Sequence, residues 1–301
     1  MGSDFPDLFG LFPEKVKLRD VTLRDGLQSE KVQLALELKV ALVRQIKAAG
    51  IREMEITAFV NPRKVPAMAD AEQLWGILSQ DTDMVFSALV FNQKGLERAL
   101  SSGVQQIAVV VSASEAHSVN NAGQGIQKAL AEAIDVLGQA KASGMSIRAV
   151  VASAFGCNME GEIPVSRVRS LLEAFSQQAP EEVALADTSG SGNPRKIMER
   201  VQLCREIMGE RRLSLHFHNA SGWAFSNLLV ALQMGVETFD VTVGALGGCP
   251  FLPGAAGNLS TEHVVKFLEA MGVDTGIDTA PVQIARKMLE EHLGRQLTAP
   301  T

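Results

Sequence analysis

Strand-like segments alternate with helix-like segments along most of this chain, and this alternation limits the folds that it can adopt. Short apolar runs typical of buried β-strands lie near residues 16–23, 53–59, 84–90, 106–112, 147–154, 183–187, 213–219 and 239–246. Between most of these runs, apolar residues follow helical spacing, as Phe225, Leu228, Leu229 and Leu232 do after the seventh run. Glycines stand where the helices should stop, at positions 50, 103, 144, 235 and 272.

Eight such repeats within about 250 residues match the size and period of a (β/α)8 TIM barrel. We therefore predict a single α/β domain over residues 1–301, with the barrel at about 14–275. Helical spacing in the tail predicts an extra C-terminal helix at about 279–295, packed on the barrel or on a partner subunit. A doubly wound parallel sheet is the alternative, because the repeat alone does not distinguish the two folds.

Composition excludes several classes of partner. The 301 residues are 46% hydrophobic and 21% charged, with a formal net charge of −6. No cluster of Lys and Arg stands out, which argues against nucleic acid, and no apolar run is long enough to span a membrane. The first residues lack the basic region and apolar core of a secretory signal. Three widely spaced cysteines suit reduced thiols, so we expect a cytoplasmic location.

Two of the five histidines stand close together in the seventh strand-like run, as His216-Phe217-His218. Leu213, Leu215 and Phe217 alternate with polar residues there, so both imidazoles should point to the same face of the strand, about 7 Å apart. Neutral imidazole is a common metal ligand, which makes a divalent metal site one interpretation. A pair of hydrogen-bonded core histidines explains the same spacing.

Further reactive groups follow the ends of other strands, where a barrel places its chemistry. Arg24 and Asp25 follow the first strand, Glu55 lies late in the second, and Cys249 stands in a Gly-Gly-Cys-Pro loop after the eighth. Taken one at a time, each has an ordinary structural explanation, such as a salt bridge for Arg24 or inert packing for the cysteine. Their gathering at one rim favours a site.

The motifs around these residues resemble those of 3-hydroxy-3-methylglutaryl-CoA lyase, within the superfamily of metal-dependent TIM-barrel lyases and aldolases. The resemblance runs from about residue 14 to about 280, and its motifs begin at Thr22-Leu23-Arg24-Asp25-Gly26, Glu55-Ile56-Thr57, Ala186-Asp187-Thr188, His216-Phe217-His218, Gly247-Gly248-Cys249-Pro250 and Pro253-Gly254-Ala255-Ala256-Gly257-Asn258.

The resemblance implies an acyl-CoA thioester substrate, a divalent metal, usually Mg²⁺ or Mn²⁺, and a homodimer. The metal ligands carried over are Asp25, His216, His218 and Asn258. Two nitrogens and hard oxygens suit a six-coordinate ion with positions left for substrate and water. The implied reaction is a retro-Claisen cleavage, in which a tertiary 3-hydroxyacyl-CoA yields acetyl-CoA and a keto acid.

The reaction requires the hydroxyl proton to leave, the thioester enolate to be stabilised and the enolate carbon to be protonated. We expect Arg24 to face the enolate oxygen, because a guanidinium stays charged and offers a fixed fork of donors. Asp25, His216 and Glu55 are candidate proton acceptors that the sequence does not rank. Cys249 is the expected catalytic loop residue, and its thiol suits proton donation. We expect Asp20 and Asp187 to orient the other groups.

The chain departs from the family pattern around the expected acyl group. It has no tyrosine, Val150 stands where the family tends to place one, and Ala184 stands where a serine is usual. We therefore hypothesise a lyase of the same reaction type with a larger or less polar acyl substrate. The alternatives are a related aldolase or lyase of the same superfamily, a non-haem iron oxygenase, and a non-catalytic acyl-CoA-binding homologue.

Overall fold

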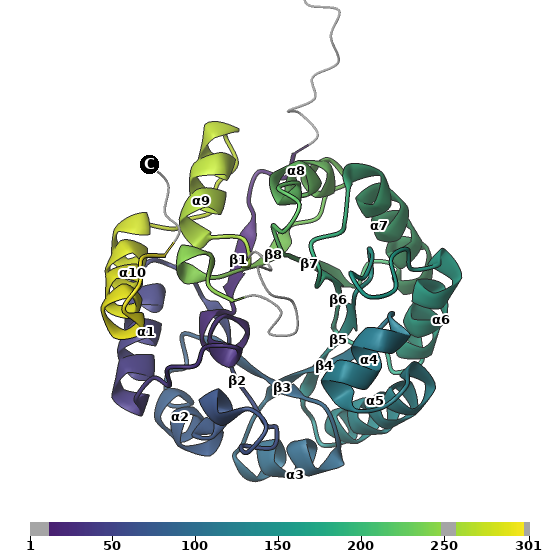
Figure 1. Ribbon diagram of the computed structural model, residues 1–301, viewed down its shortest axis with the longest axis horizontal. Helices are drawn as coiled ribbons and strands as arrows, with labels where there is room; N and C mark the ends of the chain where they lie inside the picture. Colours follow the sequence, from purple (N-terminus) through teal and green to yellow (C-terminus); the bar gives the residue numbers. More distant parts are fainter. Residues whose placement is uncertain (1–11, 248–256, 298–301) are drawn as a thin grey trace, which may run out of the picture.

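A computed structural model describes residues 12–247 and 257–297 of the chain. Its eight parallel strands pair in sequence order, and β8 pairs with β1 to close the barrel drawn end-on in Figure 1. The strands are β1 (Lys17–Asp20), β2 (Glu53–Ala58), β3 (Val85–Val90), β4 (Gln106–Ser112), β5 (Ser146–Ala152), β6 (Glu182–Asp187), β7 (Arg212–Phe217) and β8 (Thr238–Val241). The predicted TIM barrel is confirmed, and the doubly wound alternative was wrong.

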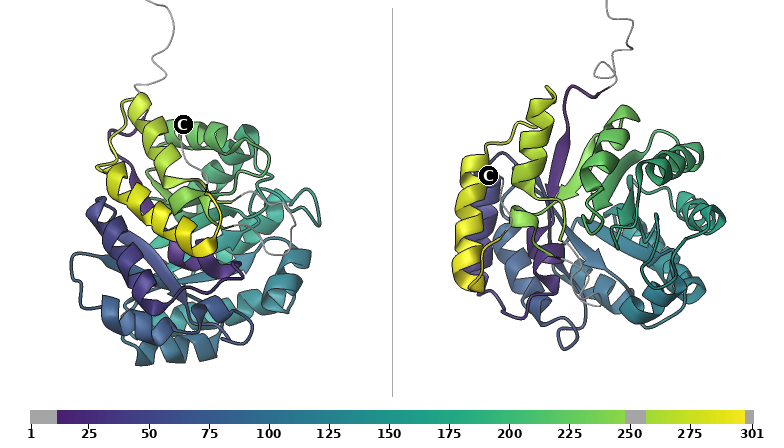
Figure 2. Two further views of the ribbon diagram at one scale, coloured as in Figure 1. Left: turned by 60° about the vertical axis from the view of Figure 1, so that its left-hand side comes forward. Right: turned by 45° about the horizontal axis from the view of Figure 1, so that its top comes forward.

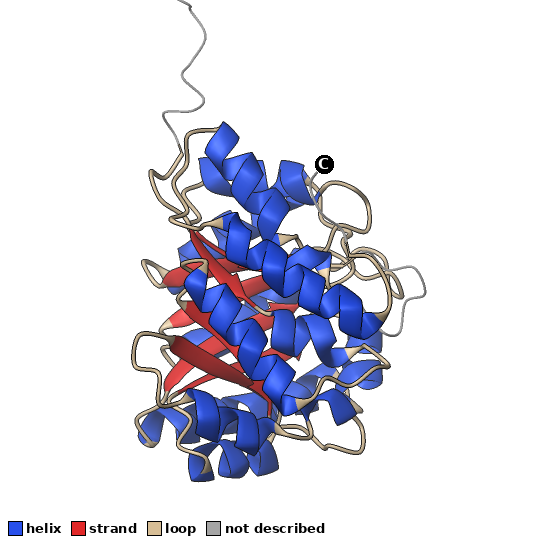
Figure 3. Ribbon diagram, turned by 90° about the vertical axis from the view of Figure 1, so that its left-hand side faces the viewer, coloured by secondary structure: helices blue, strands red, loops and turns tan. Residues whose placement is uncertain are grey.

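Helices surround the barrel, with the strands inside (Figures 1 and 3). In the described part of the chain they are α1 (Leu36–Ala48), α2 (Ala71–Leu78), α3 (Gln93–Ser101), α4 (Glu115–Ala122), α5 (Ile126–Ala142), α6 (Val165–Ser176), α7 (Pro194–Met208), α8 (Ala224–Gln233), α9 (Thr261–Ala270) and α10 (Thr279–Leu293). None of these is long and apolar enough to cross a membrane.

The extra C-terminal helix is α10, which packs against α1 and α9 of its own chain (Figure 2). Val282, Ala285 and Leu289 form its buried face. The helix ends at Gly294, which caps it in the left-handed conformation at φ 65°. The expected helix therefore exists and covers the barrel of the same chain.

The apolar core lies between the strands and the surrounding helices. In β7, Leu215 and Phe217 are fully buried in this layer, while Ser214 and His216 alternate with them and take part in contacts inside the barrel. The alternation follows from the two-residue period of a strand, which sends neighbouring side chains to opposite faces.

Charged side chains from β1, β5, β6 and β8 pair across the interior of the barrel. Arg19 of β1 binds Glu182 of β6 through two hydrogen bonds of 2.7 and 2.6 Å. Arg148 of β5 lies 2.7 Å from Asp240 of β8 and 2.9 Å from Glu182. All four side chains are about 2–3% exposed, so each charge depends on its partners.

Five strands end earlier than their apolar runs, by one residue in β2, two in β5 and β7, three in β1 and five in β8. The run at 16–23 ends as a strand at Asp20, because the chain then coils into the π-helical turn η1 (Thr22–Gly26). The run at 239–246 leaves the sheet at Val241 and enters the 3-10 turn η3 (Val243–Ala245), while β7 ends at Phe217 instead of 219. After β1 and β8, the apolar residues that follow the strand belong to the turns η1 and η3, where Leu23 and Val243 are buried.

Candidate metal centre and active site

The turn η1 carries Arg24 and Asp25 to the mouth of the barrel. It closes with a hydrogen bond from Gly26 N to Val21 O (3.1 Å), five residues back, a wide turn that is rare and often functional. Asp20 fixes its start by accepting hydrogen bonds from the backbone nitrogen and hydroxyl of Thr22, at 2.9 and 2.8 Å. The sequence predicted an orienting role for Asp20, and this contact is consistent with it.

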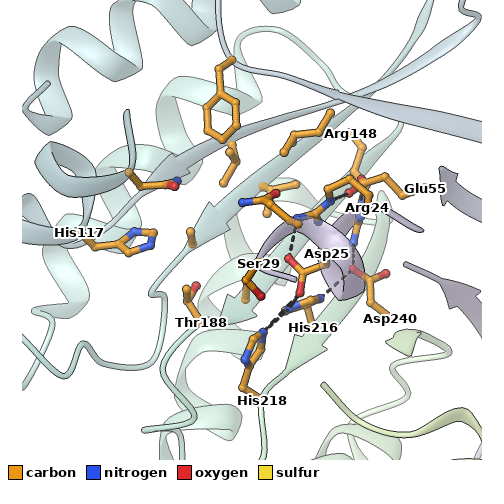
Figure 4. Close-up of a pocket in the computed structure, with 18 residues that line it drawn as sticks. Arg24, Asp25, Ser29, Glu55, His117, Arg148, Thr188, His216, His218 and Asp240 are labelled. Atoms are coloured by element: carbon orange, nitrogen blue, oxygen red, sulfur yellow. Dashed lines mark hydrogen bonds and ion pairs between the residues drawn. The ribbon is translucent and has the colours of Figure 1, made fainter. Parts of the chain in front are cut away.

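Asp25, His216 and His218 meet in one cluster (Figure 4). The two Nε2 atoms are 3.0 Å apart, and Asp25 Oδ2 lies 3.8 Å from that of His216 and 3.7 Å from that of His218. The two imidazoles thus point toward one another and toward Asp25, as their two-residue spacing predicted. His218 has left the strand and forms an isolated bridge with Asn258.

Asn258 lies beside Asp25, although 233 residues separate the two. Its Nδ2 donates to Asp25 Oδ2 at 2.8 Å and to Leu246 O at 3.0 Å. Its Oδ1 is buried and has no hydrogen-bond partner among the described residues. The chain reaches this position through Gly257, where a Cβ would lie only 1.8 Å from Ala245 O. A side chain at residue 257 would therefore displace the amide.

This donor set fits a divalent metal ion. Two Nε2 atoms 3.0 Å apart have the spacing of adjacent ligands of an octahedral ion with bonds of about 2.1 Å. The orphaned Oδ1 of Asn258 offers a further donor, and a buried carbonyl oxygen without a partner is costly unless something occupies it. A mixture of imidazole, carboxylate and amide donors excludes the thiolate-rich pattern of structural zinc.

Asp240 orients the first of the two imidazoles. Its Oδ2 lies 3.3 Å from His216 Nδ1, an arrangement that places the ring proton on Nδ1 and leaves the lone pair of Nε2 directed at the cluster. Burial alone would raise the pKa of Asp240, but Arg148, His216 and Arg19 hold it far below its usual range. Asp240 is thus a permanent anion behind the site.

Asp25 is also held ionised. Burial would raise its pKa, but Arg24 and the two imidazoles outweigh burial and hold the pKa well below the usual range. Arg24 lies 2.5 Å from Asp25 Oδ1 through Nη1 and binds Glu55 through Nε. Glu55 is in turn 3.5 Å from Arg148. One chain of ion pairs therefore runs from Asp25 to the interior of the barrel.

Of the two other predicted residues, Asp187 and Cys249, the structure describes only Asp187. Asp187 accepts hydrogen bonds from the backbone nitrogens of Ser191 (3.0 Å) and Gly192 (2.9 Å), so it shapes the loop before α7 and does not contact the cluster. Burial raises its pKa to about 6, although these two donors oppose the rise. Cys249 lies outside the described residues.

The cluster opens into a cavity whose lining includes residues that the sequence analysis missed. Arg148 and Asp240 line it from β5 and β8, and His117 lines it from α4 on the far side in Figure 4. A single charged residue between apolar neighbours, as in Ile147-Arg148-Ala149 and Phe239-Asp240-Val241, is the signal that could have revealed the first two. Nothing in the sequence near His117 marks it in this way.

Comparison with known proteins agrees with this geometry. Hydroxymethylglutaryl-CoA lyase YngG of Bacillus subtilis is 36% identical over 290 residues, covering 95% of this chain and 96% of that protein. The crystal structure of hydroxymethylglutaryl-CoA lyase from Pseudomonas aeruginosa matches with a TM-score of 0.90 at 33% identity, covering 96% of each chain.

A second solved structure contains bound molecules. It is a lyase of the same name from Acinetobacter baumannii, in complex with coenzyme A and 3-methylmalate, and it matches with a TM-score of 0.90 at 32% identity over 95% of this chain and 93% of that one. The HMGL-like family model matches residues 15–289. The chain therefore belongs to the HMGL-like family and is a carbon–carbon lyase.

Proposed function

We propose that this chain cleaves a tertiary 3-hydroxyacyl-CoA thioester to acetyl-CoA and a ketone or keto acid, with a divalent metal, Mg²⁺ or Mn²⁺, at the barrel mouth. The observation that carries the proposal is the cluster of Asp25, His216 and His218 beside the guanidinium of Arg24. Relatives over nearly the whole chain are named hydroxymethylglutaryl-CoA lyases, and one was solved with coenzyme A.

In this proposal Asp25, His216, His218 and Asn258 hold the metal. All four are buried or half-buried, and their donor atoms are the oxygens and nitrogens that such ions accept. When bound, the ion supplies Lewis acidity toward the substrate hydroxyl and fixes the orientation of the substrate.

Arg24 stabilises the enolate oxygen of the departing acetyl-CoA. Glu55 and Asp25 hold its Nε and Nη1, so the guanidinium cannot turn away and its remaining N–H donors stay aimed in one direction. Burial would lower the pKa of Arg24, but Glu55 and Asp25 raise it, so the cation persists throughout the reaction. A preorganised donor of this kind stabilises developing charge without reorganisation.

Proton transfer needs an acceptor at the hydroxyl and a donor at the enolate carbon. Asp25 is the acceptor that we propose, because its carboxylate stays ionised in the cluster. His216 carries its ring proton on Nδ1 and directs Nε2 at the proposed metal, so it has no nitrogen left to accept a proton. Glu55 is engaged by Arg24 and lies near Arg148. Cys249 is the proposed proton donor, on the strength of its family motif. We further propose that the chain forms a homodimer, which light scattering in solution tests. We also propose a cytoplasmic location.

The test is release of acetyl-CoA from a panel of tertiary 3-hydroxyacyl-CoA thioesters. We expect release with Mg²⁺ or Mn²⁺, loss of release with a chelator, and restoration when metal is added back. His216→Ala should abolish release and weaken Mn²⁺ binding in calorimetry, while His263→Ala on the outer helix α9 should leave both near normal. Metal-loaded protein that binds acyl-CoA but cleaves none of the panel would refute the lyase and favour a binding homologue.

A further inference from the structure

We propose that the natural substrate carries an uncharged hydrocarbon group on C3, in the place where hydroxymethylglutaryl-CoA has its carboxymethyl group. This inference rests on the proposed function and adds the substrate class. Its basis is the chemistry of the cavity into which the metal cluster opens.

One wall of that cavity, away from the cluster, is apolar. It is formed by side chains from the inner faces of β3, β4, β5 and β6 and from the residue after β3, namely Leu89, Phe91, Val110, Val150, Ala152 and Ala186. Val110 and Val150 are register partners on neighbouring strands, and both are half-buried, with their open sides on the cavity. Ala184, the partner of Val150 on β6, adds no polar atom. Hydrocarbon packed against this wall leaves water for an apolar surface, which is favourable.

The cations that line this cavity in the described part of the chain are already paired. Arg24 binds Glu55 and Asp25, and Arg148 lies within 3.0 Å of both Asp240 and Glu182. Lys64 and Lys94 line a neighbouring cavity and are exposed. A substrate carboxylate that lies against the apolar wall, away from the proposed metal, would have to compete with these buried acids for a guanidinium, and a buried charge without its own partner is costly.

The remaining polar residues that line this cavity carry no charge; they are Gln28, Ser29, Asn121, Thr188 and His117, the last of which faces the apolar wall from α4. His117 Nδ1 lies 3.0 Å from Ser112 Oγ, and the ring is 7% exposed. Burial lowers its pKa below the usual value, so the imidazole is neutral at physiological pH. His117 can therefore donate or accept a hydrogen bond but does not supply the positive charge that a carboxylate needs.

The reaction on such a substrate balances without another reactant. The hydroxyl gives up its proton, the C2–C3 bond breaks with its electron pair going to C2, and C3 becomes the carbonyl of a neutral ketone. C2 then takes up one proton to complete acetyl-CoA. With an isobutyl group, which has the same shape as carboxymethyl, the ketone is 4-methylpentan-2-one.

A binding experiment separates charge from shape. 3-Methylglutaryl-CoA and 3,5-dimethylhexanoyl-CoA lack the hydroxyl, so neither is cleaved, and they differ only by carboxymethyl against isobutyl. We expect the Mg²⁺-loaded protein to bind the isobutyl thioester at least tenfold more tightly in calorimetry, because at the apolar wall the carboxylate loses its hydration without gaining a cationic side chain. Equal affinity, or tighter binding of the carboxylate, overturns the inference.

A matched pair of variants tests the position of the wall. Val150→Tyr places a hydroxyl donor there, and Val150→Phe adds nearly the same bulk without it. Relative to the Phe variant, the Tyr variant should shift the affinity ratio toward the carboxylate by about tenfold or more, the range expected for a hydrogen bond to a charged group. Identical ratios in the two variants would show that the substituent does not meet this wall.

Turnover of the hydroxylated pair separates this inference from the proposed function. We expect kcat/KM for 3-hydroxy-3,5-dimethylhexanoyl-CoA to exceed that for hydroxymethylglutaryl-CoA. A preference for hydroxymethylglutaryl-CoA would overturn the hydrocarbon class and leave the lyase intact. Binding of the isobutyl thioester with no cleavage of either hydroxylated compound would instead refute the lyase.

Discussion

Replacing Arg148 by methionine should destabilise the protein strongly, although the new side chain fills most of the same space. Arg148 is 2% exposed and bridges two carboxylates inside the barrel, Asp240 at 2.7 Å and Glu182 at 2.9 Å. A third acid, Glu55, lies 3.5 Å away. The substitution removes one cation from a network that cannot recruit water to replace it.

The magnitude follows from what each acid retains. Glu182 keeps its two hydrogen bonds from Arg19, and Glu55 keeps Arg24, so neither is left alone. Asp240 loses its closest cation and keeps Arg19 only at 3.4 Å. Breaking one partner of a buried pair costs about 3–5 kcal/mol, which is a large share of the roughly 5–15 kcal/mol that stabilises a typical domain.

The assay is urea unfolding of Arg148→Met and of a matched control, Arg212→Met. Arg212 contacts the same network, through Glu53 and Glu182, but its side chain is 32% exposed. Solvent screens such a pair, so the control should lose about 1 kcal/mol or less. Equal losses in the two variants would refute the reasoning, because burial would then not set the cost.

The pH dependence adds a second check. In the wild type the pKa of Asp240 lies far below its usual value, so Asp240 stays ionised. Its favourable pairing therefore stabilises the fold fully at any pH above the pKa that this carboxyl has in the unfolded chain. In the variant its pKa rises, because burial is no longer offset by Arg148. Protonation then relieves the unpaired charge as the pH falls. The difference in free energy of unfolding should therefore be largest near neutral pH and shrink toward about pH 4.

Three further predictions concern single residues. Burial raises the pKa of Asp20 to about 7 against the hydrogen bonds from Thr22, so between about pH 4 and pH 7 the folded state holds a proton that the unfolded state has lost. Wild-type stability should fall relative to Asp20→Asn as the pH rises through this window, and parallel profiles in urea would contradict the shift. Asn258→Ala should weaken Mn²⁺ binding by about tenfold or more in calorimetry, and unchanged affinity would remove it from the ligand set. Cys204 is 1% exposed and burial raises its pKa to about 12, so its thiol should react with a disulfide reagent only after denaturation. Peptide mapping that finds Cys204 labelled in the native protein would contradict this prediction.

Much of the candidate site could be predicted from local sequence patterns. The two-residue period placed His216 and His218 on one face, and the position of Arg24 and Asp25 after the first strand placed them at the same rim. Asn258 entered only through the family motif, because no periodicity marks a loop amide. Its contact with Asp25 depends on a close backbone approach at Gly257.

The sequence by itself determined the eightfold repeat, because hydrophobic period is a local property that neighbouring residues carry. The pairing of β8 with β1, which distinguishes a barrel from a doubly wound sheet, is a tertiary feature. Only the tertiary structure decided how the interior charges pair. Arg19 meets Glu182 across 163 residues, and Arg148 meets Asp240 across 92, because closure of the sheet brings inward-facing side chains of separate strands to one axis. It also placed His117 opposite the cluster of Asp25, His216 and His218, and so gave the cavity one neutral and one charged side.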